Sequence, residues 1–267
     1  MLVPFLFMWL IQIHAEEGPA TAIAKISNEN SPSVVNISTA NIVLLQNHRY
    51  WGEYGSALDG FFNRYSKIAI GARQLKSLGS GVIVSKDGLI VTNAHAINMS
   101  GKIYATLNDK ESYKSEVIRI NQKNDLALIK ISVNRPLKPI EFGPSPTVGE
   151  AVVSMGNPHG LESSASSGIV KATGVGFNFK LPNNLAFENL IETDAAIDLG
   201  TSGGALLDLD GKLVGINLAI LQKGRSLSFA IPIDRVKEML KEYETSKGEK
   251  KNIKIRLPPT PNYRRTK

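Results

Sequence analysis

The stretch Ile191-Glu-Thr-Asp-Ala-Ala-Ile-Asp-Leu-Gly-Thr-Ser-Gly-Gly-Ala-Leu206 carries the strongest signal for fold and chemistry in this 267-residue chain. At its centre, Ser202 lies between Gly200-Thr201 and Gly203-Gly204. Glycines around a serine favour a tight turn, because glycine adopts φ values that other residues resist. Such a turn can present the hydroxyl outward and direct backbone N–H groups at one point, where they would stabilise an oxyanion. An ordinary glycine-rich hairpin is the alternative.

A serine hydroxyl is a weak nucleophile, so Ser202 would need a base and a carboxylate from elsewhere in the chain. His95 follows an apolar run and is predicted to lie at the end of a strand, and Asp125 precedes a second apolar run. Each has a structural explanation when taken alone, since Asp is common in turns and at strand starts. Together they occur in the order His, Asp, Ser, separated by 30 and 77 residues. This is the order of chymotrypsin-like proteases rather than of subtilisin or the α/β-hydrolases.

The region after Gly79 contains short β-branched runs that are separated by turn signals such as Asp87-Gly88 and Asp210-Gly211. Many short strands at this spacing predict an all-β barrel or sandwich. The predicted strands are Ser33–Thr39, Gly81–Val84, Leu89–Thr92, Ile103–Leu107, Val117–Ile120, Leu126–Ile131, Ala151–Met155, Ile169–Val175, Leu213–Ile220 and Leu227–Ile231. Apolar residues with helical spacing predict a closing helix around 236–243, with Asp234 as its candidate cap, and a short helix is predicted over Ala20–Asn30.

Composition limits the chemistry and the partners. The chain has no cysteine, which excludes disulfides and cysteine metal ligands, and we expect neither a cofactor nor a metal. The net charge is +7, but residues 245–267 hold eight basic residues and one acid, so this basic tail accounts for all of it. The neutral body gives no indication of a nucleic-acid partner. We expect a disordered, solvated tail, with weak contact to anionic surfaces as the functional alternative.

The N-terminal residues predict export. Residues 2–13 are apolar but too few to span a bilayer comfortably, so residues 1–15 are interpreted as a signal peptide cleaved after Ala15. The alternative is an inner-membrane anchor through residues 2–13. Residues 16–78 form an N-terminal segment with many aromatics, which either pack on their own domain or form a subunit contact. These aromatics are Tyr50, Trp51, Tyr54, Phe61, Phe62 and Tyr65.

Several linked motifs resemble those of the HtrA serine proteases, the family of DegP, DegS and DegQ, from about Ile23 to Tyr243. The resemblance implies a chymotrypsin/trypsin-like double β-barrel over 79–244, with its first strands from about residue 23. It also implies ATP-independent endoproteolysis of unfolded or misfolded proteins in the bacterial periplasm. The matching motifs are Gly79-Ser-Gly-Val-Ile-Val84, Thr92-Asn-Ala-His95, Asp125-Leu-Ala-Leu128, Gly156-Asn-Pro158, Thr193-Asp-Ala-Ala-Ile197 and Gly200-Thr-Ser-Gly-Gly-Ala-Leu206.

The resemblance also implies roles for individual residues. Ser202 would be the nucleophile, His95 the general base and acid, and Asp125 the carboxylate that orients the imidazole. The backbone N–H groups of Gly200 and Ser202 would form the oxyanion hole. The strand that pairs with substrate would include Asn217, Leu218, Ala219 and Ile220, and its apolar character predicts a preference for small or medium aliphatic residues before the cleaved bond.

Departures from the family pattern keep other readings open. The family sequence Asn-Pro-Gly-Asn-Ser-Gly-Gly is replaced by Asp198-Leu-Gly-Thr-Ser-Gly-Gly204, so Leu199 and Thr201 could change how readily the turn takes its active shape. Nothing after the closing helix resembles a PDZ domain. The family forms trimers through the region before the first barrel. Phe61-Phe62 resembles an aromatic pair of that region, so the resemblance implies a homotrimer here as well. The alternatives are a catalytically weak chaperone or binding module with a protease fold, and a surface-binding protein with a basic tail.

Overall fold

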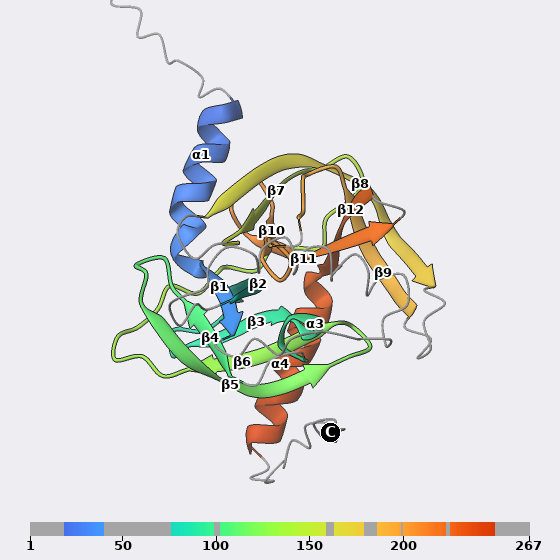
Figure 1. Cartoon of the computed structure of the whole chain (residues 1–267). Helices are drawn as coiled ribbons and strands as arrows, with labels where there is room; N and C mark the ends of the chain where they lie inside the picture. Colours follow the sequence, from blue (N-terminus) through green and yellow to red (C-terminus); the bar gives the residue numbers. More distant parts are fainter. Residues whose placement is uncertain are drawn as a thin grey trace, which may run out of the picture.

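The computed structural model describes residues 19–39, 76–98, 102–158, 163–178, 186–198, 200–222 and 225–248. Within these ranges the chain forms two closed antiparallel β-barrels of six strands each, which lie against one another (Figure 1). The predicted all-β double barrel with a C-terminal helix is therefore confirmed. In sequence, the aromatic residues at 50–65 fall between two strands of the first barrel, at 34–39 and 76–83, and not before that barrel. These aromatics, the segment 2–13 and most of the basic tail lie outside the described residues.

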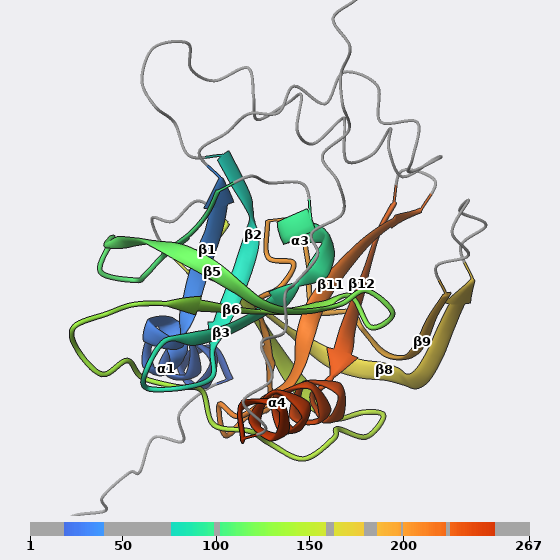
Figure 2. The same cartoon turned by 90° about the horizontal axis from the view of Figure 1, so that it is seen from below.

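The first barrel has the strand order β1-β2-β3-β6-β5-β4. A short helix, α3 (Ala94–Asn98), follows β3 directly, and Figure 2 shows it between the first-barrel strands and β11 of the second barrel. The strands of this barrel are β1 (Val34–Thr39), β2 (Lys76–Ile83), β3 (Leu89–Asn93), β4 (Ile103–Thr106), β5 (Ser112–Asn121) and β6 (Leu126–Ile131).

The second barrel has the order β10-β11-β12-β9-β8-β7. Helix α1 (Pro19–Asn30) and one 3-10 turn (Ser31–Ser33) precede β1, and helix α4 (Ile233–Gly248) follows β12. The strands of this barrel are β7 (Ala151–Gly156), β8 (Ser164–Asn178), β9 (Ala186–Thr193), β10 (Ala205–Leu207), β11 (Leu213–Gln222) and β12 (Arg225–Pro232).

The apolar strands of the first barrel are buried on both faces, and alternation assigns each face to a different core. On β3, Ile90 points into the barrel, whereas Leu89 and Val91 join the core between the two barrels. On β6, Ala127 and Ile129 alternate in the same way with their neighbours. The core between the barrels also takes residues from α1 and α4. These helices therefore contribute to the apolar core that packs the two barrels together.

Each predicted strand overlaps an observed one, but several local expectations were wrong. His95 belongs to α3, because β3 ends at Asn93. Asp234 lies inside the first turn of α4 and not at a cap, and its Oδ2 accepts a hydrogen bond from Ser145 Oγ at 2.5 Å. Helix α4 continues to Gly248, past the predicted start of the disordered tail at residue 245.

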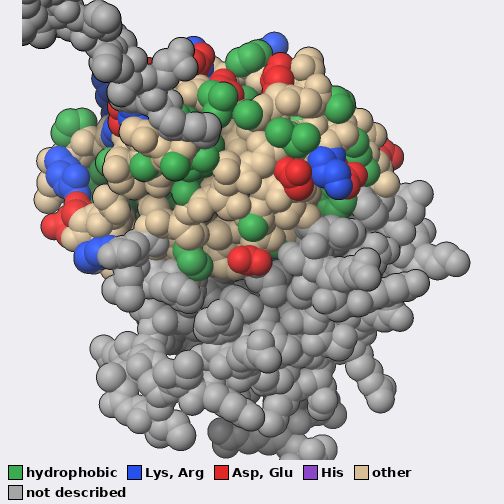
Figure 3. All heavy atoms as spheres, turned by 90° about the horizontal axis from the view of Figure 1, so that it is seen from above, with side chains coloured by type: hydrophobic (Ala, Val, Ile, Leu, Met, Phe, Trp, Pro, Cys, Tyr) green, Lys and Arg blue, Asp and Glu red, His purple; other side chains and the backbone are tan. Residues whose placement is uncertain are grey.

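Charged side chains on the described surface are mixed in sign. Figure 3 shows one face, on which the few basic groups lie close to acidic ones and hydrophobic side chains form separate groups. The part of this face that Figure 3 colours by type therefore carries no large area of a single charge sign.

Candidate active site

The His95 and Asp125 side chains meet because of strand register in the first barrel. Strands β3 and β6 pair so that Asn93 lies opposite Leu126. His95 follows the end of β3 by two residues, and Asp125 immediately precedes β6. Two residues just beyond the same end of paired strands are held close together, so the apolar pattern of the strands places these polar side chains.

The pair is joined by side-chain and backbone hydrogen bonds. His95 Nδ1 lies 2.6 Å from Asp125 Oδ2, and the His95 backbone N–H donates to Asp125 Oδ1 at 2.8 Å. Ala94 N–H donates to the Asp125 carbonyl at 3.0 Å. The Asp125 side chain is 6% exposed and the His95 side chain 22% exposed. A carboxylate facing Nδ1 favours the tautomer with the proton on Nδ1, which leaves Nε2 as a hydrogen-bond acceptor.

Burial and charge act in opposite directions on the imidazole. Burial alone lowers the pKa of His95, because it penalises the charged ring, but the nearby Asp125 charge and hydrogen bond outweigh it. The net result is a pKa of His95 above its ordinary value of 6.5. The ring is therefore a better proton acceptor than a free histidine.

The turn around Ser202 lies between β9 and β10 of the second barrel and faces the His95 helix. Gly203 has a φ of +82°, and a Cβ there would lie 2.3 Å from Ser80 O. Its N–H donates to Asn217 O at 2.8 Å. A Cβ at Gly79 would lie 2.8 Å from Ser202 O and 3.9 Å from Ala96 Cβ, so Ser202 and the residue after His95 flank the same glycine. The three predicted triad residues therefore converge where the barrels meet.

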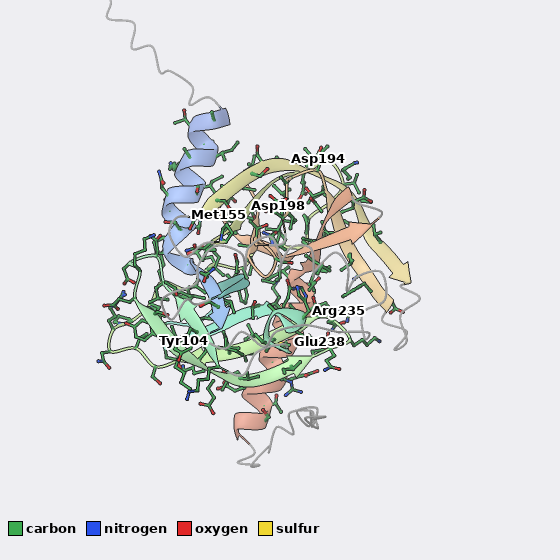
Figure 4. All side chains as sticks on the ribbon, in the orientation of Figure 1. Tyr104, Met155, Asp194, Asp198, Arg235 and Glu238 are labelled. Atoms are coloured by element: carbon green, nitrogen blue, oxygen red, sulfur yellow. The ribbon has the colours of Figure 1, made fainter. Side chains whose placement is uncertain are left out.

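The Ser202 turn is hydrogen-bonded to itself. Asp198 O accepts the Thr201 N–H at 2.9 Å and the Ser202 N–H at 3.1 Å. The Thr201 hydroxyl binds both the N–H and the carbonyl of Asp198, each at 2.9 Å. Figure 4 shows Asp198 among the second-barrel strands, with Asp194 farther out on the same barrel. One of the two predicted oxyanion donors, the Ser202 N–H, thus already has an acceptor.

The Ser202 side chain is also engaged within its own barrel. Ser202 is 1% exposed, and its Oγ accepts the Ala219 N–H at 3.1 Å. Among the described residues, no hydrogen bond joins Ser202 to His95. The hydroxyl is therefore not presented outward, as the glycine-rich sequence suggested, but is directed at the Ala219 N–H of β11.

The predicted substrate strand is part of β11, and one edge of this strand is only partly paired by the residues that the structure describes. Strand β11 continues to Gln222, whereas its ladder with β10 covers only Leu213–Ile216. The Asn217 backbone bonds to the turn, since its carbonyl accepts the Gly203 N–H at 2.8 Å and its N–H donates to Gly204 O at 2.9 Å. Its side-chain amide donates to Ser154 Oγ at 3.0 Å and to Met155 O at 3.1 Å on β7. Leu218 is 3% exposed and belongs to the core between the barrels, and Ala219 is 8% exposed. Ile220 pairs with Leu227 of β12.

Ser80, a residue without an assigned role in the sequence motifs, contacts the Ser202 turn from the opposite barrel. Its hydroxyl donates to Gly200 O at 2.9 Å, and its N–H donates to Ser202 O at 2.8 Å. In the sequence, Gly79-Ser-Gly is part of a motif that carries the family resemblance, and nothing there shows that β2 passes this turn. Within the described residues, no group of three or more His, Asp or Glu side chains could hold a metal ion.

Comparison with known proteins defines the class. Residues 79–216 match the trypsin-like peptidase domain, so the chain belongs to that family. A probable periplasmic serine endoprotease, DegP-like, from Halomonas elongata is 36% identical over 222 residues, which are 77% of this chain and 46% of that protein. The mitochondrial serine protease HTRA2 of Bos taurus is 41% identical over 180 residues, 66% of this chain and 37% of that protein. The predicted HtrA-like, trypsin-fold serine protease is confirmed.

The structural comparison supports the fold independently. The MamO protease domain from Magnetospirillum magneticum aligns with a TM-score of 0.62 at 18% identity and covers 79% of this chain and 96% of that one. At this identity the likeness concerns the fold alone. The chain spans about half the length, or less, of the curated relatives compared above, 46% and 37%.

Proposed function

We propose that the protein is a serine endopeptidase that cleaves unfolded or misfolded polypeptides through Ser202, His95 and Asp125. The single observation that carries the proposal is the His95–Asp125 pair at 2.6 Å, which faces a glycine turn bearing a buried serine. A histidine oriented by a carboxylate is what a serine needs to become nucleophilic. Membership of the trypsin-like peptidase family supports the same chemistry.

In the proposed reaction, Ser202 Oγ forms a bond to the scissile carbonyl carbon while His95 Nε2 takes the hydroxyl proton. The imidazolium then gives that proton to the amine nitrogen, the C–N bond breaks, and an acyl-enzyme remains. Water then attacks the carbonyl carbon of the acyl-enzyme while His95 Nε2 takes its proton. His95 returns that proton to Ser202 Oγ as the ester bond breaks, which releases the acid and Ser202. Asp125 keeps the ring oriented and stabilises its positive charge. The Ser202 hydroxyl must first leave Ala219 N–H and turn toward His95.

Substrate would add as a strand along the free edge of β11, where Ala219 N–H is directed toward the reaction centre. Once Ser202 Oγ moves away, this N–H becomes available to a substrate carbonyl. The oxyanion would bind the N–H groups of Gly200 and Ser202 after Asp198 O gives up the latter. Buried Ala219 and Ala230 on the paired strands β11 and β12 favour an aliphatic residue before the cleaved bond.

The test compares casein cleavage by the wild-type protein with cleavage by Ser202→Ala. Ser33→Ala is the matched control, because Ser33 is also buried and its hydroxyl donates to Lys138 O at 2.9 Å, in a hydrogen bond that does not involve the Ser202 turn. We expect the control to cleave casein and Ser202→Ala to lose cleavage with unchanged circular dichroism. Equal cleavage by the Ser202 variant would refute the assignment.

A second function, binding of unfolded chains with weak catalysis, is favoured by one observation, the self-bonded turn. If it applies, Ser202→Ala should suppress aggregation of a denatured protein as well as the wild type does, and the wild type should cleave casein hardly at all. Rapid cleavage by the wild type would decide for the peptidase.

Export, assembly and tail contacts form part of the same proposal. Periplasmic, DegP-like relatives support an exported protein. The signal peptide at residues 1–15 is proposed from the sequence alone. The described helices include none long and apolar enough to cross a membrane. A homotrimer through Phe61 and Phe62 is testable by light scattering of the double alanine variant, and tail contact by anionic-liposome binding after removal of residues 245–267.

A further inference from the structure

We propose that Ser80 is a positioning residue for catalysis, which holds the Ser202 turn of the second barrel at a fixed place relative to His95 of the first. This role rests on the proposed function. Ser80 lies on β2, is completely buried, and is separated from Gly200 by 120 residues of sequence. It touches no group that would react, so it would act through the turn.

The Ser80 hydroxyl joins two segments of the second barrel. It donates to Gly200 O at 2.9 Å and accepts the Asn157 N–H at 2.8 Å, so its proton position is set by its two partners. Asn157 directly follows β7, and a Cβ at Gly200 would lie 2.5 Å from Pro158 Cβ. One hydroxyl therefore fixes the Gly200 carbonyl against the loop on which Gly200 packs.

The Ser80 backbone extends the same link to both sides of the site. Its N–H donates to Ser202 O at 2.8 Å, and its carbonyl accepts the Thr92 hydroxyl at 2.7 Å. Thr92 lies on β3, three residues before His95. The chain of contacts runs from the strand that carries the base, through Ser80, to the turn that carries the nucleophile.

The two carbonyls that Ser80 binds lie on either side of the peptide whose N–H is a proposed donor to the oxyanion. Ser80 holds Gly200 O and Ser202 O, and between them lies the peptide whose N–H belongs to Ser202. Asp198 O, which now accepts that N–H, is not bonded to Ser80. The Asp198 carbonyl can therefore move away while Ser80 keeps the Ser202 peptide in place. A displacement of about 1 Å at a reacting group can cost on the order of 100-fold in rate.

A merely structural serine would affect stability and leave the kinetic pattern unchanged. A positioning serine should affect kcat and the binding of tetrahedral analogues, and should leave substrate binding and the His95 titration as they are. These readouts separate the two roles.

The experiment measures kcat, KM and the inhibition constant of a peptidyl boronate with valine next to boron. The proteins are wild type, Ser80→Ala, Ser80→Thr, Ser202→Ala and the control Ser33→Ala. For Ser80→Ala we expect kcat to fall at least about tenfold, boronate affinity to fall in proportion, and KM and the pKa of the acid limb to stay unchanged. Ser80→Thr keeps a hydroxyl and should restore most of the rate. If Ser80→Ala does not fold, Ser80→Cys, with its weaker donor, replaces it in the same comparison.

A Ser80 variant with kcat within about twofold of wild type, or with a loss equal to that of Ser33→Ala, overturns the inference. So does a loss confined to KM, and so does a Ser80→Thr variant that folds without recovering kcat. In these cases an active wild type and an inactive Ser202→Ala leave the proposed function intact. A wild type with no activity, or an active Ser202→Ala, refutes the proposed function instead.

Discussion

The two halves of the site, which come from different barrels, are prepared to different degrees. In the first barrel, His95 and Asp125 already make the hydrogen bonds that catalysis needs, at 2.6 and 2.8 Å. In the second barrel, Ser202 Oγ accepts from Ala219 and Ser202 N–H donates to Asp198. The proposed base is in place, whereas the proposed nucleophile and one proposed oxyanion donor are occupied by their own barrel.

This difference indicates where the energetic cost of activation lies. Activation requires at least two hydrogen bonds of the Ser202 turn to be exchanged, each of which contributes about 0.5–1.5 kcal/mol net. The His95–Asp125 pair needs no rearrangement. Variants of His95 or Asp125 should therefore remove catalysis, whereas variants that alter only the hydrogen bonds within the Ser202 turn should change how often the active arrangement is populated.

The largest effect is expected from Asp125→Asn. The Asn side chain can still accept the His95 backbone N–H, but its NH₂ group then faces Nδ1 and forces the wrong tautomer, which should lower kcat about 10⁴-fold. Steady-state hydrolysis of a peptide ester measures the loss. Asp194→Asn is the matched control, because Asp194 accepts the Ile169 N–H at 2.7 Å away from the triad. Equal effects of the two variants would contradict the special role of Asp125.

The pH dependence of kcat/KM also tests the His95–Asp125 pair. The pKa of His95 is raised above 6.5 because the Asp125 interactions outweigh burial. A base must be neutral to accept the serine proton, so kcat/KM should fall as pH decreases through this pKa, about tenfold for each further pH unit. The imidazole titration of Ser202→Ala, followed by NMR, should give the same pKa. An acid limb or a titration at or below 6.5 would contradict the prepared base.

The pairing of His95 with Asp125 in the first barrel could largely be predicted from sequence, because it depends on local sequence patterns. The apolar runs of β3 and β6 set the register that brings His95 and Asp125 together, and alternation and turn signals are readable in a single chain. In the second barrel, strand β9 was not predicted, because two acids and Asn189, with a φ of +61°, interrupt its apolar alternation. The three-residue β10 is too short to show a period.

The state of the Ser202 turn and the contact from Ser80 could not be predicted. Both depend on hydrogen bonds between residues far apart in sequence, such as Ser80 to Gly200, and on the orientation of single peptides. The sequence showed that Thr201 departs from the family pattern, but not that its hydroxyl binds Asp198 on both sides.

Thr201→Val tests the turn around Ser202 in the second barrel. It should raise kcat moderately, whereas Asp125→Asn should lower it. Removing the hydroxyl loosens the self-bonded turn, so the active arrangement should become more populated and kcat should rise about two- to tenfold. Thr193→Val is the matched control, because the Thr193 hydroxyl donates to Ile169 O at 2.8 Å and accepts the Ala195 N–H at 3.1 Å in the same barrel. Parallel changes in kcat for both variants would show that the Thr201 hydroxyl does not hold the resting turn.

The smallest effect concerns Asp87, at a hairpin of the first barrel, where no effect on catalysis is expected. Hydrogen bonds from Lys130 and Ser85 lower the pKa of Asp87 from 3.8 to about 2. This lowered pKa makes a contribution to stability that is present above 3.8 and is lost as pH falls through about 2. Lys130→Met should return the pKa toward 3.8, as read by NMR titration, with kcat unchanged. A changed kcat would mean that the hairpin influences the site.

Activation of Ser202 as a nucleophile by His95 can be measured by labelling the protein with a fluorophosphonate probe and locating the adduct by peptide mass spectrometry. We expect one adduct on Ser202 in the wild type, greatly slowed labelling in His95→Ala, and none in Ser202→Ala. An adduct on another serine of an active preparation, or casein cleavage by a protein whose Ser202 stays unlabelled, would contradict it.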